Sequence, residues 1–147
     1  MDFTEEEERK FSLRPGDLLV CEGGEPGRSA VWQGQISPCY YQKALHRLRP
    51  TGGIVDPYFL MYRLWLGAIN AEFFDSQAKT TIAHLPAVRL ASLLVELPPL
   101  VDQQRSAAIL NEKMIAAEQT RKAVEEKLAA INALPTALLR CAFAGEL

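Results

Sequence analysis

The side chains best suited to chemistry in this sequence are cations and amides gathered just after two tyrosines at positions 40 and 41. They are Gln42, Lys43, Arg47 and Arg49. Guanidinium, ammonium and amide groups bind the phosphates and base edges of nucleic acids, so this segment is predicted to face DNA. The alternative is a strand face that is only solvated. Further candidates for DNA contact lie in a Gly-rich loop and a polar turn: Arg28, Lys79, Thr80, Thr81 and His84.

No residue pattern indicates a catalytic centre. The two histidines, His46 and His84, have no Cys, Asp or Glu beside them at metal-ligand spacing. The Gly-rich loop 22–27 lacks the Lys and Ser/Thr that complete a phosphate-binding loop. Ser37-Pro38-Cys39-Tyr40 loosely resembles the catalytic loop of amino methyltransferases, but the second proline and a Gly-rich turn for S-adenosylmethionine are absent. The sequence therefore predicts a protein that is not an enzyme, with no metal site and no cofactor bound by this chain.

The largest predicted element is a helix over residues 102–134, which Pro135 is expected to end. At 1.5 Å per residue it would span about 50 Å, longer than so small a domain. Its seam follows the alternating steps of three and four that are typical of coiled coils: Ala107, Leu110, Met114, Ala117, Arg121, Val124, Leu128 and Ile131. We predict that this seam, with the charged Arg121 at a core position, packs on a partner helix. The alternative is a helix that lies on its own domain.

Composition limits the class of protein. The chain has 147 residues and a formal net charge of −2, so its bulk charge does not indicate nucleic-acid binding. Its three cysteines lack C-x-x-C spacing, which favours free thiols in a reducing compartment. The acidic N-terminus is unlike a signal peptide, and the apolar run 58–71 is interrupted by Arg63 and too short to span a bilayer. We therefore expect a cytoplasmic protein with no membrane segment.

Local signals predict the remaining elements. Thr4 and Glu7 form a capping box that opens a short helix. Strands are predicted at 18–21, 29–33, 40–49 and 94–97, and helices at 57–71, 86–93 and 136–143. The predicted fold class is α+β: a small mixed sheet with short helices, followed by a long C-terminal helix of the coiled-coil type.

Four segments, taken in order, resemble one family. They are residues 13–20 (LRPGDLLV), 80–85 (TTIAHL), 97–105 (LPPLVDQQR) and 139–147 (LRCAFAGEL). This order is similar to the specificity (S) subunit of type I restriction–modification enzymes, in its C-terminal half. The Pro-Pro-Leu and Gln-Gln-Arg junction that leads into the long helix is the most specific part of the resemblance.

The resemblance implies a division of labour. In that family two target-recognition domains are each followed by a long helix, the helices pack antiparallel, and modification subunits dock on them. Methyl transfer and cleavage belong to partner subunits that bind S-adenosylmethionine and ATP. For this chain it implies a partial target-recognition domain at 1–100, a spacer or dimerisation helix at 101–134 and a short C-terminal helix or tail at 135–147. The expected partners are double-stranded DNA, modification (methyltransferase) subunits and a second long helix, as in a homodimer.

A second hypothesis comes from another class of function. The chain would be a structural or regulatory remnant that dimerises through its helix and binds no DNA. The acidic charge balance favours this hypothesis, as does the expected absence of the front part of the recognition domain.

Overall fold

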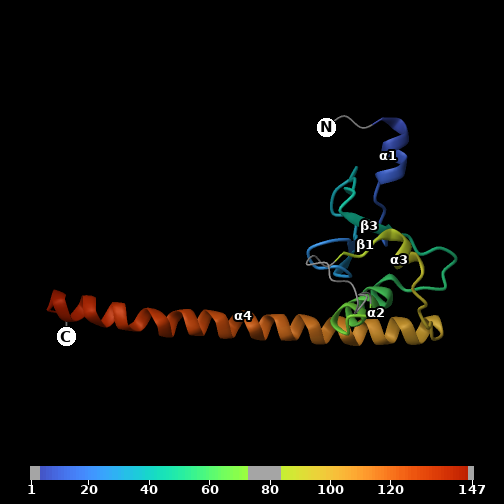
Figure 1. The fold of residues 1–147 in the computed structure, drawn as a ribbon. Coiled ribbons are helices and arrows are strands. Elements are labelled where there is room, and N and C mark those ends of the chain that lie inside the picture. The colour runs from blue at the N-terminus through green and yellow to red at the C-terminus, as the bar shows by residue number, and fades with distance from the viewer. Residues whose placement is uncertain (1–3, 73–83, 146–147) are drawn as a thin grey trace. The chain divides into compact units, whose positions relative to one another are not determined.

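The computed structural model describes residues 4–72 and 84–145 of the chain (Figure 1). The chain divides into two compact units, Met1–Ala107 and Ala108–Leu147. The described elements are α1 (Glu5–Phe11), β1 (Leu18–Cys21), β2 (Ser29–Val31), β3 (Leu45–Leu48), α2 (Pro57–Ile69), α3 (Ala87–Ala91) and α4 (Leu100–Ala144). The α+β class and the long C-terminal helix predicted from the sequence are confirmed.

The three strands form one sheet in the order β2-β1-β3. Both pairings are antiparallel. The sheet is therefore antiparallel throughout, whereas a mixed sheet was expected. The connections between these strands contain no described helix, whereas a parallel pair needs a long crossover. In the β1–β3 register Leu19 lies opposite Arg47 and Val20 lies opposite His46. The arginine therefore projects from the face of the sheet that does not carry the buried Leu18 and Val20.

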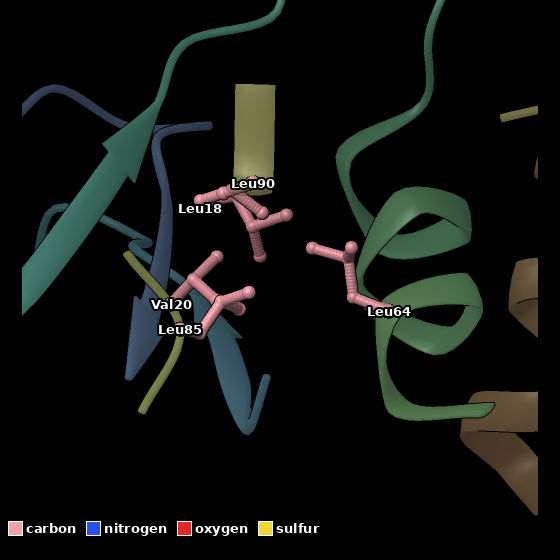
Figure 2. Packing of buried hydrophobic residues seen from close by; sticks show 5 residues of the cluster. All are labelled: Leu18, Val20, Leu64, Leu85 and Leu90. Atoms are coloured by element: carbon pink, nitrogen blue, oxygen red, sulfur yellow. The ribbon is translucent and has the colours of Figure 1, made fainter. Parts of the chain in front are cut away.

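One hydrophobic core holds the N-terminal unit together. Leu18 and Val20 project from the sheet towards Leu64 of α2, and Leu85 and Leu90 close the same cluster (Figure 2). All five are at most 7% exposed. The alternation of buried and half-buried residues along β1 is that of a strand with one face on the core. The core thus fixes which face of the sheet remains available for polar side chains.

The predicted starts of the first helix and of the helix at residue 57 are confirmed. The Thr4 side chain accepts a hydrogen bond from the Glu7 amide while the Glu7 carboxylate accepts one from the Thr4 amide, which is the predicted capping box. At the start of α2 the Asp56 carboxylate accepts a 2.9 Å hydrogen bond from the Phe59 amide, with proline in the first turn.

Two of the predicted strands are corrected by the structure. Residues 94–97 do not form a strand, and Leu94 is 95% exposed. An apolar run becomes a strand only when another strand accepts its hydrogen bonds, which composition does not reveal. The strand predicted at 40–49 is confined to Leu45–Leu48, since a turn precedes it.

The predicted end of the long helix at Pro135 is wrong. The helix continues through Pro135 to Ala144 and absorbs the short helix expected at 136–143. Proline has no backbone N–H, so the helix lacks the one hydrogen bond that this residue would donate to the carbonyl four residues earlier. All described residues around Pro135 are exposed, apart from the half-exposed Ala137, so water can satisfy that carbonyl. The flanking residues are mostly Ala and Leu, which favour helix on both sides of the proline.

Candidate functional site

Gln42 and Lys43 are the accessible members of the predicted DNA-binding segment. Both lie in the turn before β3, where the Leu45 amide donates to the Gln42 carbonyl over 3.0 Å, and both are exposed. A turn held in this way presents the two side chains to solvent. A cation and an amide side by side can bind a phosphate and a base edge, as the sequence suggested.

Arg47 is committed to contacts within its own unit. Its guanidinium donates a 2.7 Å hydrogen bond to the Ser12 carbonyl and lies 5.3 Å from the centre of the Tyr41 ring. That ring makes an edge-to-face contact with Phe11, at 5.5 Å between centroids. The arginine therefore ties β3 to the segment that follows α1, and only part of its surface is available to a ligand.

Arg49 is held by a buried carboxylate. Its guanidinium donates two hydrogen bonds of 2.6 Å to Asp17, which is 1% exposed, and a third of 3.2 Å to the Ser12 carbonyl. Burial on its own would raise the pKa of Asp17, but the hydrogen bonds from Arg49 and from the Arg14 amide hold that pKa below its ordinary value. This bidentate pair gives Arg49 a structural role that requires no contact with DNA.

The other predicted contacts are dispersed. Arg28 forms a 2.5 Å exposed ion pair with Glu25 of the Gly-rich loop. The imidazole of His84 lies 3.2 Å from the Glu22 carboxylate, beside an isolated bridge between His84 and Gly23. The three remaining candidates, Lys79, Thr80 and Thr81, lie outside the described residues.

The acidic helix α1 lies against the predicted DNA-binding segment, a contact that no local pattern in the sequence indicates. Ser12 bridges to Tyr40, and the Tyr41 amide donates to the Phe11 carbonyl over 3.1 Å. The pKa of Tyr40 is raised by partial burial and by the charge and hydrogen bond of Glu8. The pKa of Glu7 is lowered by its hydrogen bonds with Thr4 and, to a smaller extent, by the charge of Lys43. Carboxylates therefore stand next to the cations that were expected to meet phosphates.

Apart from Ala107, which is 4% exposed and already buried within its own chain, the predicted seam of α4 is exposed. Among the described residues of α4, the buried ones are Gln103 and Ala107. The exposed fraction of the larger seam residues is 42% for Leu110, 43% for Met114, 58% for Val124, 55% for Leu128 and 60% for Ile131. Ala117 is exposed as well. Monomeric soluble proteins rarely leave a continuous apolar stripe of this length in water, because its burial is favourable by about 25 cal/mol per Å².

The exposed apolar surface extends beyond the predicted seam. Leu134, Leu138 and Leu139 are each more than half exposed, and Phe143 is 91% exposed. In α4 the most apolar 18-residue window has a mean hydropathy of 1.2, so length and composition would allow it to cross a membrane. One such helix is weak evidence for a bilayer, since helices that pair in soluble assemblies have the same properties.

Arg121 is paired within its own helix. Its guanidinium donates to Glu118 at 2.6 and 2.9 Å and to Glu125 at 2.5 Å. The pKa of Arg121 is raised by these carboxylates, chiefly by Glu118, whose own pKa is lowered by the same pair. A charge at a core position is thus already balanced before any partner arrives, and it can be buried at lower cost than a lone guanidinium.

Comparisons with known proteins give a consistent result. The chain is 27% identical over 141 residues to the EcoBI type I restriction enzyme specificity subunit of Escherichia coli, which covers 95% of this chain and 29% of that protein. It is 28% identical over 116 residues to a putative MjaX type I restriction enzyme specificity subunit of Methanocaldococcus jannaschii, covering 76% of this chain and 27% of that protein. No family model matches the chain.

A solved structure agrees with these relatives. It concerns complex assembly and conformational transition of a type I R-M system, and one of its chains is 26% identical, with a TM-score of 0.75 over 93% of this chain and 33% of that chain. The present chain thus spans less than a third of the length of either specificity subunit. The fold and the relatives together confirm that this chain resembles a part of the specificity subunit of type I restriction enzymes.

Proposed function

We propose that this chain is a DNA sequence-recognition (specificity) subunit or half-subunit of a type I restriction–modification complex. It binds double-stranded DNA through its N-terminal unit, and modification subunits dock on α4. It has no catalytic role of its own, since methyl transfer and cleavage belong to the partner subunits. The observation that carries the proposal is the exposed apolar seam of α4, on a fold that matches a type I R-M chain over 93% of its length.

The N-terminal unit supports a DNA-binding role at one place in particular. Gln42 and Lys43 are exposed on a turn fixed by β3, whereas Arg49 is bound to Asp17 and Arg47 to Ser12. We therefore propose Gln42 and Lys43 as the residues that contact DNA directly. Arg47 and Arg49 have a structural role, because their hydrogen bonds to Ser12 and Asp17 attach β3 and the residue that follows it to the rest of the unit.

Reconstitution with a modification subunit tests the proposal. The chain is coexpressed with an adenine methyltransferase subunit of the source organism, and the purified complex is measured for its composition and its binding to a pool of random duplex DNA. We expect a stable complex that enriches one short sequence from the pool. A stable complex without sequence enrichment would contradict DNA recognition, and failure to form any complex would contradict docking on α4.

A specific observation favours the second candidate, a structural or regulatory remnant that dimerises through its helix and binds no DNA. Glu7 and Glu8 stand beside Lys43 and Tyr40, where their charge opposes a phosphate. In this case the chain would self-associate through α4 and compete with a full specificity subunit for modification subunits. Addition of the chain would then lower the DNA binding of an assembled methyltransferase, with no new target sequence.

A further inference from the structure

Gln103 is a buried polar side chain at the start of an otherwise exposed helix. It is 1% exposed, and its amide makes three hydrogen bonds. The amide oxygen accepts from the Asp56 backbone N–H over 2.9 Å, and the amide nitrogen donates to the carbonyls of Ile54 and Pro98 over 3.0 and 2.8 Å. Both amide N–H groups and one oxygen position are therefore used, which is close to the full capacity of the side chain.

The three bonds join the first turn of α4 to two segments of the N-terminal unit, residues 54–56 and Pro98. Ile54 belongs to the loop that follows β3, and Asp56 is the residue that caps α2. Pro98 belongs to the extended segment that enters α4. Because α2 carries the core residue Leu64, the amide of Gln103 links the first turn of α4 to the element that packs on the sheet.

Among the described residues of α4, one other side chain near its beginning is buried. Ala107, four residues further on and on the same side of the helix, is the other buried residue of α4. The methyl group of Ala107 is small enough for close packing, but it forms no hydrogen bond that could orient the helix. Asp102 and Arg105 pair with each other at the surface, over 2.7 Å. Gln103 supplies three directional contacts at this junction.

The chemistry of the site explains why an amide stands there. The site offers one backbone donor and two backbone acceptors, and glutamine supplies both an acceptor and donors on one planar group. A leucine or methionine would leave all three backbone groups without a partner. A glutamate would satisfy the Asp56 amide but would set its negative charge against two carbonyl oxygens.

We propose that Gln103 is a positioning residue that fixes the first turns of α4 on the N-terminal unit. The inference rests on the proposed function, in which DNA is bound by the N-terminal unit while modification subunits dock on α4. A methyltransferase docked on the helix can place its catalytic centre against a particular base only if this junction is rigid. Gln103 then affects the rate of methylation through geometry, without contact with DNA or with the reacting groups.

The chain itself gives the first test, by hydrogen–deuterium exchange. Gln103→Met is compared with Gln104→Met, which changes the neighbouring exposed glutamine. We expect Gln103→Met to speed exchange by at least about tenfold in peptides covering residues 54–60 and 98–107, while exchange in β1 and β3 stays unchanged. The reason is that the junction between these two segments would open locally while the sheet remains folded. Equal exchange in the two variants would overturn the inference. Equal loss of protection in β1 and β3 would overturn it too, because Gln103 would then only stabilise the whole fold.

A charged variant distinguishes hydrogen bonding from shape. Gln103→Glu keeps the size and one acceptor but loses both donors at neutral pH. When the pH falls and the carboxylate gains a proton, it regains one donor, so the protection factors of residues 54–60 should rise towards those of the native chain. Protection that does not depend on pH, when compared with the native chain at each pH, would contradict the hydrogen-bonding role.

The assembled methyltransferase gives the second test. With duplex DNA that carries the target sequence, Gln103→Met should lower kcat by about tenfold or more and leave KM within about twofold, because the DNA-binding side chains are untouched. A rise in KM with unchanged kcat would overturn the positioning role. If the native complex itself does not select a DNA sequence, the proposed function fails, while the exchange experiment still decides whether Gln103 fixes the junction.

Discussion

The N-terminal unit and the long helix use their notable side chains in opposite ways. In the N-terminal unit the three predicted DNA-binding arginines and His84 already have partners in the same chain: Arg28 with Glu25, Arg47 with Ser12, Arg49 with Asp17 and His84 with Glu22. Along α4 the large apolar residues of the seam have none, and each is between 42% and 60% exposed. The difference teaches that residue type is a weaker guide to a binding surface than the absence of an internal partner.

The physical reason lies in the cost of exposure. A cation in water is well solvated, so a folded chain is free to use it for an internal ion pair or to leave it outside. An apolar stripe in water has a cost that grows with its area, so a long uncovered stripe indicates a partner. The helix is therefore the firmer evidence for assembly, and the DNA-binding surface has to be sought among the few cations that remain accessible.

The largest expected effect tests the helix. Leu110→Ala combined with Leu128→Ala should abolish assembly with a partner helix, because each buried leucine contributes about 2–5 kcal/mol to such an interface. The double variant should remain folded as a free chain, since both residues are exposed there. Size-exclusion chromatography with light scattering measures the assembled fraction.

A matched control sharpens this result. Ile115→Ala combined with Val101→Ala also removes two exposed aliphatic side chains, which are 51% and 73% exposed. At about 100° per residue they lie away from the seam. The control should assemble as the native chain does. Equal loss of assembly in both double variants would show that the whole helix surface is used and that no seam exists.

The next largest effect tests the internal use of a cation. Arg49→Met leaves the carboxylate of Asp17 buried without its bidentate partner and should lower the free energy of unfolding by about 3 kcal/mol. Arg28→Met, which removes an exposed pair, should cost less than about 1 kcal/mol. Urea unfolding of the two variants gives the comparison, and equal losses would mean that Asp17 and Arg49 are no more important than a surface pair.

The same ion pair has a defined pH dependence. Since the pKa of Asp17 is lower in the folded chain than its ordinary value, its contribution is complete above the unfolded pKa of about 4 and is lost as the pH falls through the folded pKa. The native chain should lose more stability than Asp17→Asn between pH 5 and pH 3, two values chosen to bracket that unfolded pKa of about 4. Parallel curves for the two proteins would contradict this assignment.

Local signals in the sequence predicted much of the fold. The Thr4 capping box, the helix that begins at Pro57 and strand β1 all depend on residues within a few positions of one another, and each was found. The partner of Arg49 is 32 residues away, and those of Gln103 are up to 49 residues away. Such contacts depend on the tertiary fold, so the sequence marked Arg49 as a DNA ligand and gave no sign that Gln103 would be buried.

An intermediate effect tests the accessible cation. Lys43→Ala in an assembled methyltransferase should weaken DNA binding and lower the slope of log affinity against log salt by about 0.9, the value for one phosphate contact. Arg89→Ala removes an exposed charge from α3 and serves as the control. A salt slope that Lys43→Ala leaves unchanged would remove Lys43 from the interface and would favour the remnant hypothesis.

The smallest expected effect concerns the carboxylate beside that lysine. Glu7→Gln keeps a capping residue of the same size at this position but removes the charge that Lys43 experiences. DNA affinity of the assembled complex should rise by less than it falls in Lys43→Ala, because the charge is fully exposed and screened by salt. Glu96→Gln, in the segment before α4, should have no effect. If Glu7 acts through Lys43, the gain disappears when Glu7→Gln is made in the Lys43→Ala background. A gain that persists there would show that α1 repels DNA directly, and the acidic helix itself would then be the main difference between this chain and a surface built to bind phosphates.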